Sequence, residues 1–272
     1  MQIPNVSGIL IENTIIPSEF LQRDVKVDFY LPENVPDPSQ MSLLLINDGQ
    51  NMKELGLRNI LEELYAGDQI RPVLCAAIHA GEQRKMEYCM ANQADYLGRG
   101  SKAGSYTSFI LEELLPFIYQ KYHVQSFKEK AFAGFSIGGL MALDIVWNHP
   151  EEFTGAGVFS GSLWWRKISQ DDEDYNDELH RIMHLQIKKG PYHPGLKFFF
   201  TTGSLDETQD RNNNGIIDSI DDTLSLLHDF EVLGYKIGKD ILYINYEDGK
   251  HDIATWARAM PVFLKWAYGK NV

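Results

Sequence analysis

Short apolar segments alternate along this chain with longer segments of helical spacing, and this alternation constrains the fold more than any other feature. The apolar runs lack the polar interruptions of a half-exposed strand, so they predict strands that are buried on both faces. These runs are Leu43–Ile46, Val73–Ile78, Ala131–Gly134, Ala156–Phe159, Leu196–Phe200 and Ile241–Tyr246. Apolar residues at helical spacing fall between them, in Leu55–Tyr65, Ser108–Tyr122, Ile137–Asn148, Thr223–Leu233 and Thr255–Tyr268.

Such alternation predicts an α/β fold, a doubly wound and mostly parallel sheet with helices on both faces. Two further strands open the chain, Gly8–Ile16 and Val25–Leu31. In the second strand Val25, Val27 and Phe29 alternate with polar residues, which indicates an antiparallel, half-exposed edge. No linker, repeat or low-complexity tract interrupts the sequence, so a single domain over residues 1–272 is expected.

Charge and the N-terminal sequence narrow the classes of partner. The chain has 25 Lys and Arg against 38 Asp and Glu, a formal net charge of −13, which disfavours nucleic acid and favours a small-molecule substrate. The first residues do not resemble a signal peptide and no apolar run is long enough to span a bilayer, so we expect a cytoplasmic protein without a membrane partner. The sequence does not indicate the oligomeric state.

The chain has two cysteines, Cys75 and Cys89. They are too few for a disulfide framework and are expected to be buried thiols.

One strand-to-helix junction carries a candidate nucleophile. Gly134-Phe135-Ser136-Ile137-Gly138 follows a predicted strand and opens a predicted helix, the pattern of a nucleophile elbow. Small residues on both sides of Ser136 let the strand and the helix pass closely, and the sharp turn strains the central residue. The alternative is an ordinary glycine-rich turn without chemistry.

A serine nucleophile needs a base and a carboxylate, and both follow in the chain order of α/β-hydrolases. His251 lies in the loop between the last predicted strand and the last helix, which favours it as the base over a surface or capping histidine. Asp206, in the loop after Leu196–Phe200, is our choice for the acid, and its neighbour Glu207 is the alternative. The sequence does not separate these adjacent carboxylates.

The same chemistry requires backbone amides that face a developing oxyanion. The amide of Ile137, directly after the nucleophile, is one expected donor. The amide of Gln50, in Asn47-Asp48-Gly49-Gln50-Asn51, is the other, although a plain Asp-Gly turn is the alternative.

Two polar segments, residues 80–104 and 163–194, follow predicted strand ends and are expected to form walls or a lid over the site. Trp164 and Trp165 are candidate substrate contacts because tryptophan stacks well on flat groups, although core packing explains such a pair equally well. Arg99 and Tyr106 are weaker candidates.

Several of these motifs together resemble a known family. Gly-Phe-Ser-Ile-Gly-Gly from Gly134, Asp48-Gly49-Gln50, Ser160-Gly161-Ser162-Leu163-Trp164-Trp165 and Gly249-Lys250-His251-Asp252 with Trp256 are similar to the esterase D-like esterases, in order and over nearly the whole chain. That group includes enterochelin (siderophore) esterases, feruloyl esterase domains, S-formylglutathione hydrolase and mycolyltransferases. The resemblance implies an α/β-hydrolase fold and a Ser-His-Asp carboxylic ester hydrolase without an organic cofactor. We expect neither the extra N-terminal domain of siderophore esterases nor the signal and carbohydrate-binding module of secreted feruloyl esterases, so neither substrate is assigned.

A separate motif predicts a calcium ion. From Asp210 the chain reads Asp-Arg-Asn-Asn-Asn-Gly-Ile-Ile-Asp-Ser-Ile-Asp, which is the spacing of an EF-hand loop with aspartate at its last position. The expected ligands are Asp210, Asn212, Asn214, the carbonyl of Ile216, Asp218 and Asp221. We expect a structural calcium ion that stiffens the segment carrying Asp206; an Asn/Gly-rich turn before a capped helix is the alternative.

The predicted function is therefore cleavage of a small-molecule carboxylic ester through an acyl-enzyme, with Ser136, His251 and Asp206 as the triad. Two alternatives remain open: an acyltransferase that uses the same triad, and a hydrolase-like binding protein without turnover.

Overall fold

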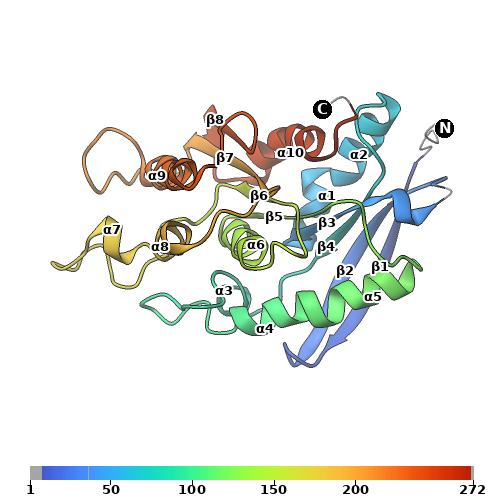
Figure 1. Cartoon of the computed structure of the whole chain (residues 1–272), viewed down its shortest axis with the longest axis horizontal. Helices are drawn as coiled ribbons and strands as arrows, with labels where there is room; N and C mark the ends of the chain where they lie inside the picture. Colours follow the sequence, from blue (N-terminus) through green and yellow to red (C-terminus); the bar gives the residue numbers. More distant parts are fainter. Residues whose placement is uncertain (1–7, 36, 271–272) are drawn as a thin grey trace.

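The structure, a computed structural model, describes residues 8–35 and 37–270. Within them one eight-stranded sheet runs through the molecule in the order β1-β2-β4-β3-β5-β6-β7-β8 (Figure 1). The strands are β1 (Ile9–Ser18), β2 (Arg23–Pro32), β3 (Ser42–Asn47), β4 (Val73–Ile78), β5 (Lys130–Phe135), β6 (Gly155–Phe159), β7 (Lys197–Leu205) and β8 (Ile241–Lys250).

The sheet has the strand order and direction of an α/β-hydrolase. Strands β3 to β8 are parallel, and β2 is antiparallel to both of its neighbours, β1 and β4. The predicted doubly wound, mostly parallel sheet with antiparallel N-terminal strands is thus confirmed. The expectation that Val25–Leu31 forms an edge is wrong, because β1 covers the outer side of β2. The expected burial of Ile241–Tyr246 on both faces is also wrong, because β8 is the opposite edge and most of its residues are partly or fully exposed.

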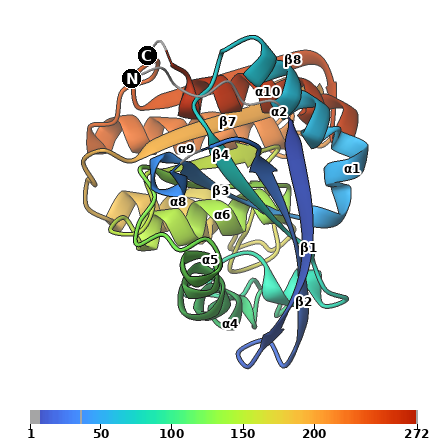
Figure 2. The same ribbon diagram turned by 90° about the vertical axis from the view of Figure 1, so that its right-hand side faces the viewer.

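Helices cover both faces of the sheet, as buried alternating strand residues require. Leu43 and Leu45 face one core, which includes α4, α5, α6, α8 and α9, whereas Leu44 and Ile46 face the other, which includes α1, α2 and α10 (Figures 1 and 2). The helices are α1 (Met52–Leu55), α2 (Leu57–Ala66), α3 (Arg84–Glu87), α4 (Ala103–Ser108), α5 (Leu115–Lys121), α6 (Ile137–Asn148), α7 (Asp177–His180), α8 (Ile182–Lys189), α9 (Asp218–Leu233) and α10 (Ile253–Tyr268). Short 3-10 turns η1 (Pro38–Gln40) and η2 (Gly49–Asn51) and the π-helical turn η3 (Phe109–Leu114) complete the elements.

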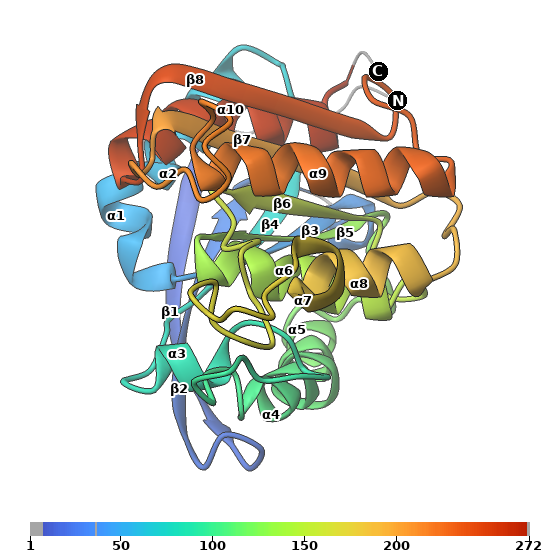
Figure 3. The ribbon, with the colours of Figure 1, turned by 90° about the vertical axis from the view of Figure 1, so that its left-hand side faces the viewer.

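Two loop regions bound the carboxyl ends of the parallel strands, where the site lies. The segment after β4 carries α3, and the segment after β6 carries α7 and α8 (Figure 3). Cys75 and Cys89 are buried free thiols, as expected. Across the described ranges, no helix is both long and apolar enough to cross a bilayer.

Candidate active site

Ser136 lies at a strained turn between β5 and α6. Its backbone has φ 55° and ψ −124°, a combination that costs a non-glycine residue on the order of 1–3 kcal/mol. The close approach of strand and helix requires glycine, because a Cβ atom on Gly134 would lie 2.2 Å from the carbonyl oxygen of Gly138. The turn presents Ser136 at a cavity of about 370 Å³. This is the geometry of a nucleophile elbow.

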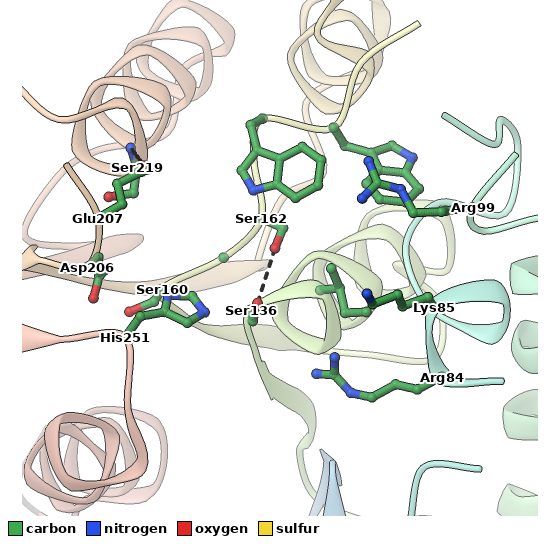
Figure 4. A pocket seen from close by; sticks show the side chains of 14 residues that line it. Arg84, Lys85, Arg99, Ser136, Ser160, Ser162, Asp206, Glu207, Ser219 and His251 are labelled. Atoms are coloured by element: carbon green, nitrogen blue, oxygen red, sulfur yellow. Dashed lines mark hydrogen bonds between the residues drawn. The ribbon is translucent and has the colours of Figure 1, made fainter. Parts of the chain in front are cut away.

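The predicted base and acid reach the same cavity from the two neighbouring strand ends. Asp206 follows β7 and His251 follows β8, and both line the cavity with Ser136. The two strands pack closely just before these residues: a Cβ on Gly203 of β7 would lie 2.5 Å from the carbonyl group of Gly249 of β8. In the close view His251 lies between Asp206 and Ser136 (Figure 4). The structure therefore brings the three predicted residues together.

The two candidate acids have different partners. Oδ2 of Asp206 accepts a hydrogen bond from the amide of Gly203 at 3.1 Å, while its Oδ1 is buried without a partner among the described residues. Oε1 of Glu207 instead accepts from the amide of Ser219 at 2.6 Å, in the first turn of α9. Burial raises the pKa of Glu207 above its ordinary value, despite that hydrogen bond. The free oxygen of Asp206 favours it as the partner of His251.

Electrostatics favour a neutral imidazole. Desolvation lowers the pKa of His251 below its ordinary value, and the positive charge of Arg84 adds to this, against the opposing effect of Asp206 and Asp252. His251 retains solvent exposure at the cavity mouth, while one side of its ring packs perpendicular to Trp256 with the ring centres 5.3 Å apart. A neutral imidazole at pH 7 is the form that accepts a proton from a serine.

The turn after β3 lies on the other side of the elbow. Asp48 is buried in the left-handed region, with φ 62°, and its carboxylate forms a bidentate ion pair with Arg84, both contacts at 2.6 Å. Gln50 follows in η2 and is exposed; its side chain donates to Asp48 and accepts from the amide of Ala80. Of the two predicted oxyanion donors, Ile137 lines the cavity, and Gln50 lies next to the turn but not among the lining residues.

The Asp48–Arg84 pair is a feature that sequence reasoning missed. Arg84 lies in the segment after β4, lines the cavity, and ties that segment to the turn after β3. An aspartate before glycine was visible in the sequence, but nothing local marked Arg84 as its partner.

Both tryptophans line the cavity, with Trp165 buried and Trp164 partly exposed. The guanidinium of Arg99 lies 5.0 and 5.2 Å from their ring centres, and the buried carboxylate of Asp95 accepts from its Nε at 2.6 Å. Tyr106 does not line the cavity: it is fully buried and donates to Asn47 at 2.6 Å.

Charge is distributed unevenly around Ser136. Arg84, Lys85 and Arg99 lie on one side of Ser136, and His251, Asp206 and Glu207 lie on the other (Figure 4). Because Arg84 and Arg99 are paired with buried carboxylates, their positions are fixed before any substrate arrives. The cavity thus has one cationic wall and one wall that carries a histidine and two carboxylates.

The loop with EF-hand spacing folds back on itself before α9. Asp210 accepts from the amides of Asn214 and Gly215 at 3.1 and 2.9 Å. Asp221 accepts from the side-chain amides of Asn212 and Asn214 at 3.0 and 3.2 Å. Four predicted ligand residues therefore lie around one loop.

The predicted ligand Asp218 is arranged differently. It is buried, and its Oδ1 accepts from the amide of Arg211 at 2.9 Å and pairs with the guanidinium of Arg211 at 3.1 Å. Within the described residues, His, Cys, Asp and Glu side chains form no group of three that could hold a metal ion. Any ion in this loop would depend on asparagine and carbonyl oxygens in addition to Asp210 and Asp221.

The sheet topology, the elbow at its centre and the acid and histidine on the next strand ends place this chain among the α/β-hydrolase enzymes. More particularly, the chain belongs to the Esterase family, whose model, described as "Putative esterase", matches residues 18–267.

Solved structures share this fold. The enterobactin esterase of Shigella flexneri matches with a TM-score of 0.70 and 19% identity over 97% of this chain, which spans 61% of the length of that protein. A ferulic acid esterase matches with a TM-score of 0.70 and 18% identity over 96% of this chain and 98% of its own. An IroE-like serine hydrolase from Shewanella oneidensis matches with a TM-score of 0.70 and 17% identity over 94% and 79% of the two chains.

Proposed function

We propose that this protein hydrolyses a small-molecule carboxylic ester through an acyl-enzyme formed on Ser136. The observation that carries the proposal is the convergence of a strained serine, a partly desolvated histidine and a carboxylate with a free buried oxygen on one cavity. Membership of an esterase family supports the reaction class.

Each residue then has one role. His251 takes the hydroxyl proton as Ser136 Oγ attacks the ester carbonyl, and Asp206 stabilises the resulting imidazolium. The imidazolium returns that proton to the leaving alcohol, so an acyl-serine and a free alcohol result. Water repeats the sequence and releases the acid. The amides of Ile137 and Gln50 are the proposed donors to the oxyanion.

The cavity walls favour an ester with a flat, negatively charged part. The partly exposed Trp164 offers aromatic surface, Arg99 is held against the rings of Trp164 and Trp165, and Lys85 is exposed beside them. The names of the similar structures, enterobactin esterase and ferulic acid esterase, agree with an aromatic ester as substrate. A panel of neutral and anionic aryl esters, compared by kcat/KM, tests this preference. Equal values for neutral and anionic esters would contradict it.

The decisive test is Ser136→Ala. We expect hydrolysis of p-nitrophenyl acetate to fall by at least about 10³-fold, together with loss of labelling by a fluorophosphonate probe. Wild-type activity in this variant would overturn the proposal. A folded wild-type protein that the probe does not label would favour the binding-protein alternative, and transfer of the acyl group to added alcohols would favour the acyltransferase.

We also propose that calcium binds the loop of residues 210–221 and stiffens the acid segment. Asp210, Asn212, Asn214, the carbonyl of Ile216 and both oxygens of Asp221 would supply six oxygens, within the range that calcium accepts, once the side-chain amides of Asn212 and Asn214 turn away from Asp221. Asp218 is excluded from direct ligation in this form, because Arg211 occupies it. The segment is linked to the site through the Ser219–Glu207 hydrogen bond, next to Asp206.

Isothermal titration with calcium tests this second proposal, with Asp210→Ala as the variant that removes a ligand. We expect binding heat and a higher Tm in wild type, since a ligand at 100 times its Kd stabilises by about 2.7 kcal/mol. The absence of binding heat, or an identical response in Asp210→Ala, would contradict calcium binding at this loop.

A further inference from the structure

The turn at Ser160-Gly161-Ser162 lies between the two halves of the active site. It follows β6, which pairs with β5, the strand that carries the nucleophile, and with β7, the strand that precedes the acid. Both serines line the cavity and both are buried, at 3% and 4% exposure. The function described above gives neither of them a role.

Ser162 contacts the nucleophile directly. Its hydroxyl lies 3.3 Å from the hydroxyl of Ser136, and its backbone amide donates to the carbonyl of Ser136 at 3.2 Å. This is the side-chain hydrogen bond that the structure gives to Ser136 Oγ (Figure 4). Ser162 therefore fixes both the backbone and the hydroxyl of the nucleophile.

Ser160 reaches the base through one intermediate residue. Its hydroxyl accepts from Nε1 of the buried Trp256 at 3.1 Å. The Trp256 ring contacts the His251 ring at a centre distance of 5.3 Å and an interplanar angle of 82°. Ser160 makes this contact from a left-handed backbone, with φ 44°, a conformation that non-glycine residues adopt at a cost.

We propose that the Ser160–Ser162 turn is a positioning element that sets the base against the nucleophile, with Ser162 holding Ser136 and Ser160 holding His251 through Trp256. The proposal rests on the Ser-His-Asp function above and adds positioning residues to it. The nucleophile and the base come from separate strands, so a misplacement of about 1 Å between them is expected to cost on the order of 10²-fold in rate.

The first test is Ser160→Gly, which removes the hydroxyl and suits the left-handed backbone. Two effects on stability oppose each other: glycine relieves the strain at φ 44°, whereas the loss of the hydroxyl leaves the buried Nε1–H of Trp256 without its acceptor, so we expect little net change. We expect kcat to fall by about tenfold or more with little change in KM. A purely structural role would not separate stability from turnover in this way. A kcat within twofold of wild type would overturn the proposal.

Ser42→Ala is the matched control. Ser42 is equally buried, its hydroxyl donates to Glu129 at 3.2 Å, and it begins β3 at the end of the sheet opposite the site. We expect its kcat to remain that of wild type. A loss of kcat equal to that of Ser160→Gly would mean that the effect is general to buried serines and would refute the proposal.

The second test is Trp256→Phe, with Trp266→Phe as control at the far end of α10. Trp256 shields one side of His251, so its replacement should raise the pKa of His251 toward the ordinary value and move the acid limb of kcat/KM to higher pH. The charged groups that act on His251, namely Asp206, Arg84 and Asp252, are unchanged by this substitution. An unmoved acid limb, or an equal shift in the control, would contradict positioning through Trp256.

A double-mutant cycle tests the contact between Ser160 and Trp256. Ser160→Gly and Trp256→Phe act on one contact, so their effects on kcat should be non-additive. Additive effects of the two substitutions would refute the contact between Ser160 and Trp256.

Ser136→Ala is measured alongside these variants. Its inactivity together with a fully active Ser160→Gly refutes the positioning role alone, and its retained activity refutes the triad and the positioning role together.

Discussion

The nucleophile elbow, residues 134–139, and the acid segment, residues 206–222, bring catalytic candidates to one cavity by different physical means. In the elbow the decisive contacts are between neighbours in sequence: Gly134 packs against Gly138, and the amide of Gly139 donates to the carbonyl of Ser136 at 3.0 Å. Two contacts with the end of β6 add to these: the amide of Ser136 donates to the carbonyl of Phe159 at 2.9 Å, and the amide of Ser162 donates to the carbonyl of Ser136 at 3.2 Å.

The acid segment depends on contacts with distant parts of the chain. Arg211, whose side chain is 9% exposed, pairs with Asp177 of α7 at 2.8 Å and with Asp222 of α9 at 2.7 Å. Gly203 packs against Gly249 of β8. A change anywhere in this ionic network is therefore expected to move Asp206, whereas the position of Ser136 depends on the elbow and on the adjacent turn after β6.

The largest expected effect separates the two candidate acids. Asp206→Asn should lower kcat by about 10³- to 10⁴-fold, because the histidine loses its charged partner. Glu207→Gln is the matched variant, and we expect less than about a tenfold loss, because Glu207 contacts the amide of Ser219. Steady-state kinetics on an aryl ester decide, and the reverse ranking would transfer the acid role to Glu207.

Arg211→Met removes the central cation of the ionic network in the acid segment, and Arg211 does not line the cavity. Removing this guanidinium leaves the buried carboxylate of Asp218 with only the backbone amide of residue 211 and leaves Asp222 with only Arg181, so we expect a loss of about 3 kcal/mol in the free energy of unfolding. Urea unfolding measures it. Arg258→Met, which breaks the exposed pair with Asp248 at 2.9 Å, should cost less than about 1 kcal/mol. Similar losses in the two variants would show that the buried network stabilises the fold no more than an exposed ion pair does.

Gly134→Ala tests the claim that the elbow is a local structure. The new Cβ would meet backbone atoms of Gly138 at 2.2 and 2.4 Å, so we expect a loss of about 1–3 kcal/mol and no fluorophosphonate labelling. Gly104→Ala, in α4 with open space around the added atom, should be neutral or stabilising by up to about 1 kcal/mol. A labelled, active Gly134→Ala would show that the elbow tolerates displacement.

The smallest expected effect is a loss of folding stability at low pH, through a buried histidine that contacts the acid segment. His184 is 1% exposed, its Nε2 donates to the carbonyl of Asp222 at 2.9 Å, and burial lowers its pKa well below the ordinary value. The unfolded chain therefore binds a proton below about pH 6.5 that the folded chain does not. Stability should fall as pH falls through this range, by at most about 1.4 kcal/mol per pH unit.

Urea unfolding at several pH values, in wild type, His184→Gln and the exposed-site control His228→Gln, checks this dependence. We expect a shallower slope in His184→Gln and an unchanged slope in His228→Gln. Equal slopes in all three proteins would show that groups other than His184 cause the pH dependence of stability.

Much of the fold was predictable because it follows from local patterns. The buried runs of β4 and the continuous helix α6 have the predicted bounds, and the strand order places the serine, the acid and the histidine at adjacent strand ends. Helix α9 begins at Asp218, earlier than the apolar spacing indicates, because its polar first turn is held by Arg211 and Glu207. The spacing of apolar residues gives no information about hydrogen bonds between a helix start and the loop before it.

The sequence by itself determined the strands, the elbow and the order of the catalytic candidates, since these depend on side-chain polarity and on glycines within a few residues of one another. Only the tertiary structure decided that Asp206 has a free oxygen while Glu207 binds a helix, that Arg84 pairs with Asp48, and that Ser160 reaches His251 through Trp256. Each of these depends on two groups far apart in the chain. Their distance is set by the packing of the sheet and its helices, which no local pattern encodes.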